Sequence, residues 1–156
     1  MKKIIYFFIL NFFLSTISFA QEKNIQVIDG DTIHIDKMKY RFFGIDAPET
    51  KQICEKDNIK IQCGVIAKNV LKNKIANKIP ECVVKDKDRY QRLVAECFVG
   101  KESLSKFMVR EGYAVAYSQY SKDFIDDEKY AKENKLGIWS MNFQVPSEYR
   151  KSLRNK

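Results

Sequence analysis

YRFFGIDAPET, residues 40–50, is the stretch from which the fold of this 156-residue chain can first be predicted. Its first half is an apolar strand that contains Arg41, and its second half is a polar loop with Pro48. A guanidinium in an apolar strand must bind an anion or point outward. Asp46 and Glu49 follow at once, so the stretch combines a phosphate-binding group with carboxylates that suit a hard cation.

The segments around this stretch predict an order of secondary-structure elements. Short strands are expected at 24–28, 32–35 and 39–44, and residues 46–63 are expected to be a loop. Apolar residues at helical spacing predict a helix over 64–77, and two more strands follow at 82–85 and 93–99. Ser103 is expected to cap a helix, and a last helix is expected from about 124 to 135.

This order predicts a β-barrel with helices, an α+β fold. Five strands with a helix between the third and the fourth is the order of a five-stranded OB-fold barrel, here with three helices. The apolar residues Phe143, Pro146 and Tyr149 indicate that the C-terminal segment lies against the body. Arg150 to Lys156 is expected to be frayed.

The N-terminus resembles an export signal. Residues 1–20 have a positive start, an apolar run and a small-residue cleavage site, which predicts a signal peptide; the alternative is an uncleaved anchor. Residues 21–156 are then one domain in the periplasm or outside the cell. Without Lys2 and Lys3 the chain has 26 basic and 20 acidic residues, a net charge of +6, which weakly favours polyanions.

The four cysteines all lie in the predicted exported part. An even number of cysteines behind an export signal favours disulfides, and three pairings are possible. We favour Cys54–Cys63, which closes a short loop, and Cys82–Cys97, which joins two strands. A zinc site is disfavoured because no CxxC is present and His34 is the only histidine.

The candidate chemistry rests on three acids and two arginines. Asp31, Asp46 and Glu49 fall at strand ends or in the adjoining loop, so they could converge on one mouth of the barrel and hold calcium or magnesium. Arg41 and Arg92 could stabilise the charge of a five-coordinate phosphate, while Glu49 takes a proton from water. Each segment alone has an ordinary structural interpretation: a turn, a salt-bridged strand residue or a helix start.

Four segments in order resemble the thermonuclease family, the staphylococcal nuclease-like proteins. They are VIDGDT at 27–32, YRFFGIDAPET at 40–50, DRYQR at 88–92 and LGIW at 136–139. The resemblance covers nearly all of the predicted exported chain. It implies an OB-fold, calcium-dependent phosphodiesterase that acts on DNA and RNA.

The resemblance also implies a role for each matching residue. Asp31 and Asp46 are expected to bind Ca²⁺ through carboxylates, and Ala47 through its main-chain carbonyl. Glu49 is the expected general base, and Arg41 and Arg92 the expected ligands of the scissile phosphate. The residues expected to bind the rest of the nucleotide are Arg89, Tyr90 and Tyr117, with Tyr120 as a weaker match.

Two departures from the family pattern stand near these residues. Gln91 replaces the usual glycine before Arg92, so the turn is expected to differ in shape. The segment 51–63 differs from the flexible loop of the best-known member, and a Cys54–Cys63 bridge would stiffen it.

The sequence predicts an exported, monomeric, calcium-dependent nuclease. The rival hypotheses are an inactive module of the same fold that binds nucleic acid or protein, and a structural envelope protein anchored by an uncleaved N-terminus.

Overall fold

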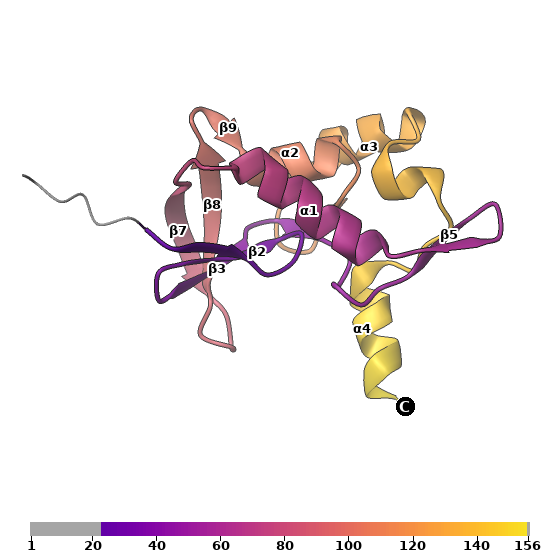
Figure 1. Cartoon of the computed structure of the whole chain (residues 1–156), viewed down its shortest axis with the longest axis horizontal. Helices are drawn as coiled ribbons and strands as arrows, with labels where there is room; N and C mark the ends of the chain where they lie inside the picture. The colour runs from indigo at the N-terminus through magenta and orange to yellow at the C-terminus, as the bar shows by residue number, and fades with distance from the viewer. Residues whose placement is uncertain (1–22, 156) are drawn as a thin grey trace, which may run out of the picture.

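The computed structural model describes residues 23–155 (Figure 1). The predicted signal peptide, residues 1–20, lies outside the described residues. Within them, no helix combines the length and the apolar character that a membrane crossing requires.

The main sheet has the order β1-β2-β3-β8-β7, with β9 paired to β8. Its strands are β1 (Ile25–Val27), β2 (Thr32–Ile35), β3 (Met38–Phe42), β7 (Glu81–Lys87), β8 (Leu93–Val99) and β9 (Glu102–Ser103). β3 and β8 pair in parallel and the other neighbours pair antiparallel. The five strands predicted from the sequence are therefore neighbours in one mixed sheet.

The closed barrel is not confirmed. Among the described residues the sheet ends at β1 on one side and at β7 on the other, and no ladder joins these two edges. Two short ladders accompany the sheet. β4 (Ile45–Asp46) pairs with β10 (Val115–Ala116), and β5 (Cys54–Lys56) pairs with β6 (Ile59–Ile61).

The prediction of a loop over 46–63 was wrong for its second part. β5 and β6 form a hairpin whose two turn residues, Asp57 and Asn58, have φ of 52° and 63°. Positive φ at both central residues is the geometry of a type I′ turn, which Asp and Asn tolerate better than most residues. An Asp-Asn pair between short alternating runs was the signal for this hairpin.

The described residues contain four α-helices where three were predicted: α1 (Cys63–Ile75), α2 (Leu104–Arg110), α3 (Ile125–Glu133) and α4 (Pro146–Arg154). A 3₁₀ turn, η1 (Gly137–Ser140), precedes α4. Ser103 caps α2 as predicted, since its hydroxyl accepts a bond of 3.0 Å from the N–H of Lys106. Figure 1 shows α1 in the middle of the view and α4, in yellow, at the C-terminal end.

The prediction of a frayed C-terminus was also wrong, because residues 146–154 form α4. Pro146 is the first helical residue, where its fixed φ suits a helix and its missing N–H costs nothing. Glu148 lies in the first turn, and Lys151 and Arg154 lie in the last, as the helix dipole favours. Tyr149 contacts the body as predicted, by donating from its hydroxyl to the carbonyl of Lys51 at 3.3 Å.

The core lies between the sheet, α1 and α2. Ile33 and Ala95 from the sheet, Leu71 from α1 and Met108 from α2 are fully buried in one cluster. A smaller cluster gathers under the 3₁₀ turn around Val115 and Ile138. Burial of these apolar groups is the main term that stabilises the fold.

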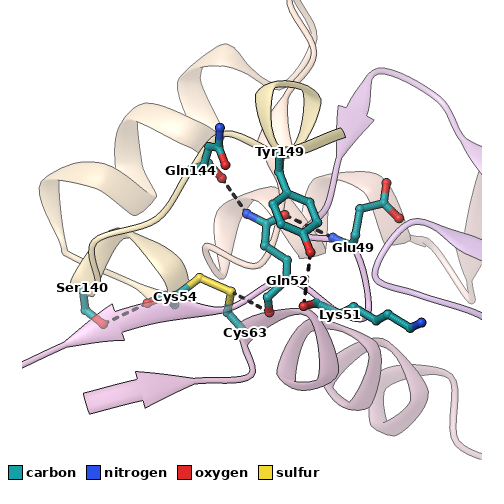
Figure 2. The surroundings of a disulfide bond; sticks show 9 residues. Glu49, Lys51, Gln52, Cys54, Cys63, Ser140, Gln144 and Tyr149 are labelled. Carbon is teal, nitrogen blue, oxygen red and sulfur yellow. Dashed lines mark hydrogen bonds between the residues drawn. A yellow bond between two sulfur atoms is a disulfide. The ribbon is translucent and has the colours of Figure 1, made fainter. Parts of the chain in front are cut away.

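Both favoured disulfides are present. Cys54–Cys63 ties the β5–β6 hairpin to the start of α1, and Cys82–Cys97 joins paired positions of β7 and β8. No cysteine within the described residues is free. The first bridge lies directly beside the loop that carries Glu49 (Figure 2).

Candidate active site

Arg41 brings the two aspartates that were predicted to bind calcium together. Its Nη1 forms an ion pair with Asp31, and its Nη2 lies 2.8 Å from Oδ1 of Asp46. The register of the sheet explains this meeting, since Arg41 on β3 is paired with Thr32 on β2, next to Asp31. Asp46 is held on β4 by its pairing with Val115.

These three charged groups are buried. Asp31 and Asp46 are each 1% exposed, and the side chain of Arg41 is 14% exposed. Burial alone would lower the pKa of Arg41, but the two carboxylates outweigh burial and raise this pKa above its usual value. The arginine therefore stays charged and neutralises the acids beneath it.

Asp31 is ionised for the same reason. Burial would raise the pKa of Asp31, but Arg41 and the N–H of Ala47, at 2.7 Å from Oδ2, hold this pKa below its usual value. Its neighbour Asp29 behaves differently. Burial, followed by the negative charge of Asp31, raises the pKa of Asp29 to about 7.

The donor set at Asp31 and Asp46 fits a hard cation. The two carboxylates converge on one guanidinium, and oxygen atoms are the donors that calcium prefers. Within residues 23–155 no group of three or more His, Cys, Asp or Glu side chains is arranged to hold a metal ion. A cation bound to these two acids would therefore have to complete its shell with main-chain and water oxygens, for which the carbonyl of the buried Ala47 is the candidate.

Glu49 lies at the edge of these buried acids. Its side chain is 35% exposed, so water reaches the carboxylate. Its N–H donates to Oε1 of Gln52 at 3.3 Å, and the amide of Gln52 donates to the carbonyl of Gln144 at 2.6 Å. Figure 2 shows this fully buried glutamine between Glu49 and the segment before α4.

Arg92 is oriented by Asp88 at the turn between β7 and β8. Oδ2 of Asp88 accepts from Nε of Arg92 at 2.7 Å, and Oδ1 accepts from the N–H groups of Tyr90 and Arg92. These bonds hold the pKa of Asp88 below its usual value, although burial opposes them. Gln91 has φ of 65°, the left-handed conformation that favours glycine, which explains why a different residue was expected there.

The remaining predicted residues include three tyrosines and an arginine. Tyr90 is 63% exposed, and its ring lies 4.9 Å from the guanidinium carbon of Arg89. Tyr117 and Tyr120 meet edge to face, with ring centroids 4.8 Å apart. Tyr90 and Tyr120 are exposed and Tyr117 is half-buried, and accessible aromatic rings can stack on bases.

A single groove on the protein is lined by most of the predicted site residues. Its volume is about 1490 Å³, larger than a typical pocket for a small ligand and suited to a polymer. Its walls include the predicted residues Arg41, Glu49, Arg89, Tyr90, Arg92, Tyr117 and Tyr120. Asp31, Asp46 and Ala47 are buried and do not line it, so the predicted cation ligands lie beside the groove rather than on its surface.

Arg150 is the residue that sequence reasoning missed. It comes from α4, and its guanidinium bonds to both oxygens of Asp46 and to Oε1 of Glu49. Burial would lower the pKa of Arg150, but Asp46 and then Glu49 raise it. The helix signals at Pro146 and Glu148 could have indicated α4, but nothing local connects Arg150 with an acid 104 residues earlier.

Fold and site together define a class: a small mixed-sheet protein with buried acids beside an arginine-lined groove. The model of the family described as "Staphylococcal nuclease homologue" matches residues 39–141, and the chain belongs to this family.

Relatives agree with this assignment. The chain is 30% identical to an "Uncharacterized endonuclease" of Haemophilus influenzae, over 96% of this chain and 86% of that protein. It is 35% identical to the "Thermonuclease" of Staphylococcus hyicus, over 76% and 75%. It is 30% identical to an "Uncharacterized endonuclease" of Escherichia coli, over 78% of both chains.

Proposed function

We propose that this protein is an exported, calcium-dependent nuclease that hydrolyses phosphodiester bonds of DNA and RNA. The observation that carries the proposal is the shared groove of Arg41, Glu49 and Arg92 beside the buried acids Asp31 and Asp46. Membership of the staphylococcal nuclease family supports nuclease activity. The printed names of the relatives, endonuclease and thermonuclease, support the same reaction class.

Each residue has a role that follows from its position in the groove. Arg41 and Arg92 bind the scissile phosphate and stabilise the additional negative charge of the five-coordinate transition state. Glu49, which is open to water, accepts a proton from the attacking water molecule. Arg89, Tyr90 and Tyr117 hold the neighbouring phosphate, sugar and base. None of these steps uses His34.

Calcium, when bound by Asp31, Asp46 and the carbonyl of Ala47, would polarise a phosphate oxygen as a Lewis acid. The hard oxygen donors and the burial of both carboxylates support this choice. Arg41 and Arg150 give positive charge to the same acids, and a bound cation would take over part of this neutralisation.

Export rests on the sequence alone. A signal peptide at 1–20 and two disulfides in the described chain together favour an oxidising compartment, the periplasm or the exterior. Mass spectrometry of the protein after expression of the full chain should find Gln21 at its N-terminus. An intact Met1 on a membrane-bound protein would instead favour the uncleaved anchor.

Hydrolysis of single-stranded DNA, first with calcium and then with a chelator, tests the activity. We expect calcium-dependent cleavage that is lost in Glu49→Gln and Arg92→Ala. Arg110→Ala is the matched control, because Arg110 pairs with Asp127 and does not line the groove. A folded, disulfide-bonded protein that cleaves nothing with calcium present would favour the inactive binding module instead.

A further inference from the structure

Arg150 neutralises the same acids that the proposed function assigns to cation binding and base catalysis. Its Nη1 lies 2.8 Å from Oδ1 of Asp46 and 3.0 Å from Oε1 of Glu49. Its Nη2 lies 3.0 Å from Oδ2 of Asp46. The contact with Asp46 is thus bidentate, the strongest arrangement of a guanidinium on a carboxylate.

Both carboxylate oxygens of Asp46 therefore already have arginine partners. Oδ1 of Asp46 is shared by Arg41 and Arg150, and Oδ2 accepts from Arg150. A cation that binds Asp46 competes for these oxygens, and its charge repels the guanidinium. The same arginine occupies Oε1 of Glu49, one of the two oxygens that can take a proton from water.

The helix that carries Arg150 is held by few contacts. Pro146 is its buried residue, and Leu153 is 51% exposed. Besides the bonds of Arg150 to Asp46 and Glu49, two hydrogen bonds join residues 144–154 to the body: Gln52 donates to the carbonyl of Gln144, and Tyr149 donates to the carbonyl of Lys51 (Figure 2). Segments with little buried apolar surface separate from the body at low cost, so α4 is suited to move.

We propose that Arg150 is a displaceable counter-ion of the active site. In the metal-free protein it holds Asp46 and Glu49 and keeps them neutralised. A cation at Asp46 displaces it, which frees Glu49 to act as base and loosens α4. This inference rests on the proposed function and adds to it a residue from the helix at the C-terminal end of the chain.

The test compares calcium affinity in three proteins, each purified after expression of the full chain. They are the unaltered protein, Arg150→Gln, and Arg154→Gln, which removes the same charge from the same helix without touching either acid. Calorimetric titration should show that Arg150→Gln binds calcium about tenfold more tightly, within the range typical of coupled sites. Arg154→Gln should bind calcium like the unaltered protein. Equal or weaker binding by Arg150→Gln would overturn the inference, because Arg150 would then not compete with the cation.

Amide hydrogen exchange gives a second readout that is independent of activity. In the unaltered protein, calcium should speed exchange in α4 while it slows exchange around Asp31 and Asp46. In Arg150→Gln, exchange in α4 should already be fast without calcium. An α4 whose exchange is unchanged or slowed by calcium would contradict displacement.

Failure of this inference can be separated from failure of the proposed function. Calcium-dependent DNA cleavage with equal affinities in all three proteins overturns only the role of Arg150. Absence of calcium binding in all three overturns the calcium dependence, and the inference with it.

Discussion

The carbonyl oxygen of Glu49 lies directly against the α-carbon of Gly64, the second residue of α1. A β-carbon at Gly64 would come within 1.8 Å of this oxygen, and within 2.6 Å of its carbon. Both atoms belong to the backbone, so the clash cannot be relieved by a side-chain rotation. The close approach of α1 therefore helps to fix the position of Glu49.

Gly64→Ala should displace the loop that carries Glu49. It should lower the rate of catalysis strongly while the sheet stays folded. We expect a loss of at least about tenfold in kcat, because a misplaced base costs rate steeply. Gly100→Ala is the matched control: nothing lies within 4 Å of its added carbon, so only a left-handed backbone cost of about 1 kcal/mol is expected. Equal activities in the two variants would show that Gly64 does not position Glu49.

Asp88→Asn should lower kcat while the fold is kept. The substitution removes the charge that orients Arg92, so the guanidinium no longer points reliably at the phosphate. We expect a kcat between those of the unaltered protein and Arg92→Ala. The double variant should be no slower than Arg92→Ala alone, since groups that act together are not additive. A further loss in the double variant would assign Asp88 a separate role.

Arg41→Ala should destabilise the protein most when calcium is absent. Asp31 would lose its cationic partner while buried, and an uncompensated buried charge costs about 3–5 kcal/mol. Calcium should restore part of this loss, because it binds the folded state and supplies positive charge. Thermal unfolding with and without calcium measures both effects. Lys39→Ala, an exposed position on the same strand, should change stability little.

Glu96→Gln should stabilise the protein at neutral pH. Burial raises the pKa of Glu96 above its usual value of 4.5, although the hydroxyl of Ser103 opposes this shift by donating to it. The folded state therefore binds this proton more tightly than the unfolded state, and stability falls as pH rises through the raised pKa. The variant should unfold at higher temperature than the unaltered protein at pH 7, and the difference should close below pH 4. A difference in unfolding temperature that persists below pH 4 would mean that ionisation of Glu96 is not the cause.

The two disulfides should have different effects on activity. Each closes a short loop, and replacing either pair with serine should cost about 2–3 kcal/mol. Removing Cys54–Cys63 should also reduce activity, because the bridge packs against Gln52: Sγ of Cys63 lies 3.5 Å from the carbonyl oxygen of Gln52, and the side-chain Oε1 of Gln52 accepts from the N–H of Glu49. Removing Cys82–Cys97 should leave kcat nearly unchanged at a temperature where both variants are folded. Equal loss of activity in both would show that the effect is general loosening.

Local pattern was enough to predict much of this molecule. The β2 and β8 strands were predicted with the observed bounds, since alternation of apolar residues reports a half-buried strand directly. The same holds for the cap of α2, the acidic first turn of α3 and the disulfide pairs. These features depend on neighbours in sequence or on a small number of possible pairings.

The family motifs predicted more of the site residues than the local sequence pattern could. Spacing cannot say that Arg41 contacts both Asp31 and Asp46, because the contact depends on the register of β3 and on the β4–β10 ladder. The predictions of metal, substrate and base roles remain predictions for the experiments above. Their residues are nevertheless neighbours in the fold.

By itself, the sequence predicted five strands of the main sheet, three of the four described helices and the family, and it favoured the observed cysteine pairs, because hydrophobic periodicity, turn residues and ordered motifs are local or short-range signals. Only the tertiary structure decided that the sheet has two unjoined edges and that α4 places Arg150 on Asp46 and Glu49. Those outcomes depend on packing and on charge pairs between residues about a hundred positions apart. No local preference in the chain reports such a pair, since it forms only after the fold has brought both partners together.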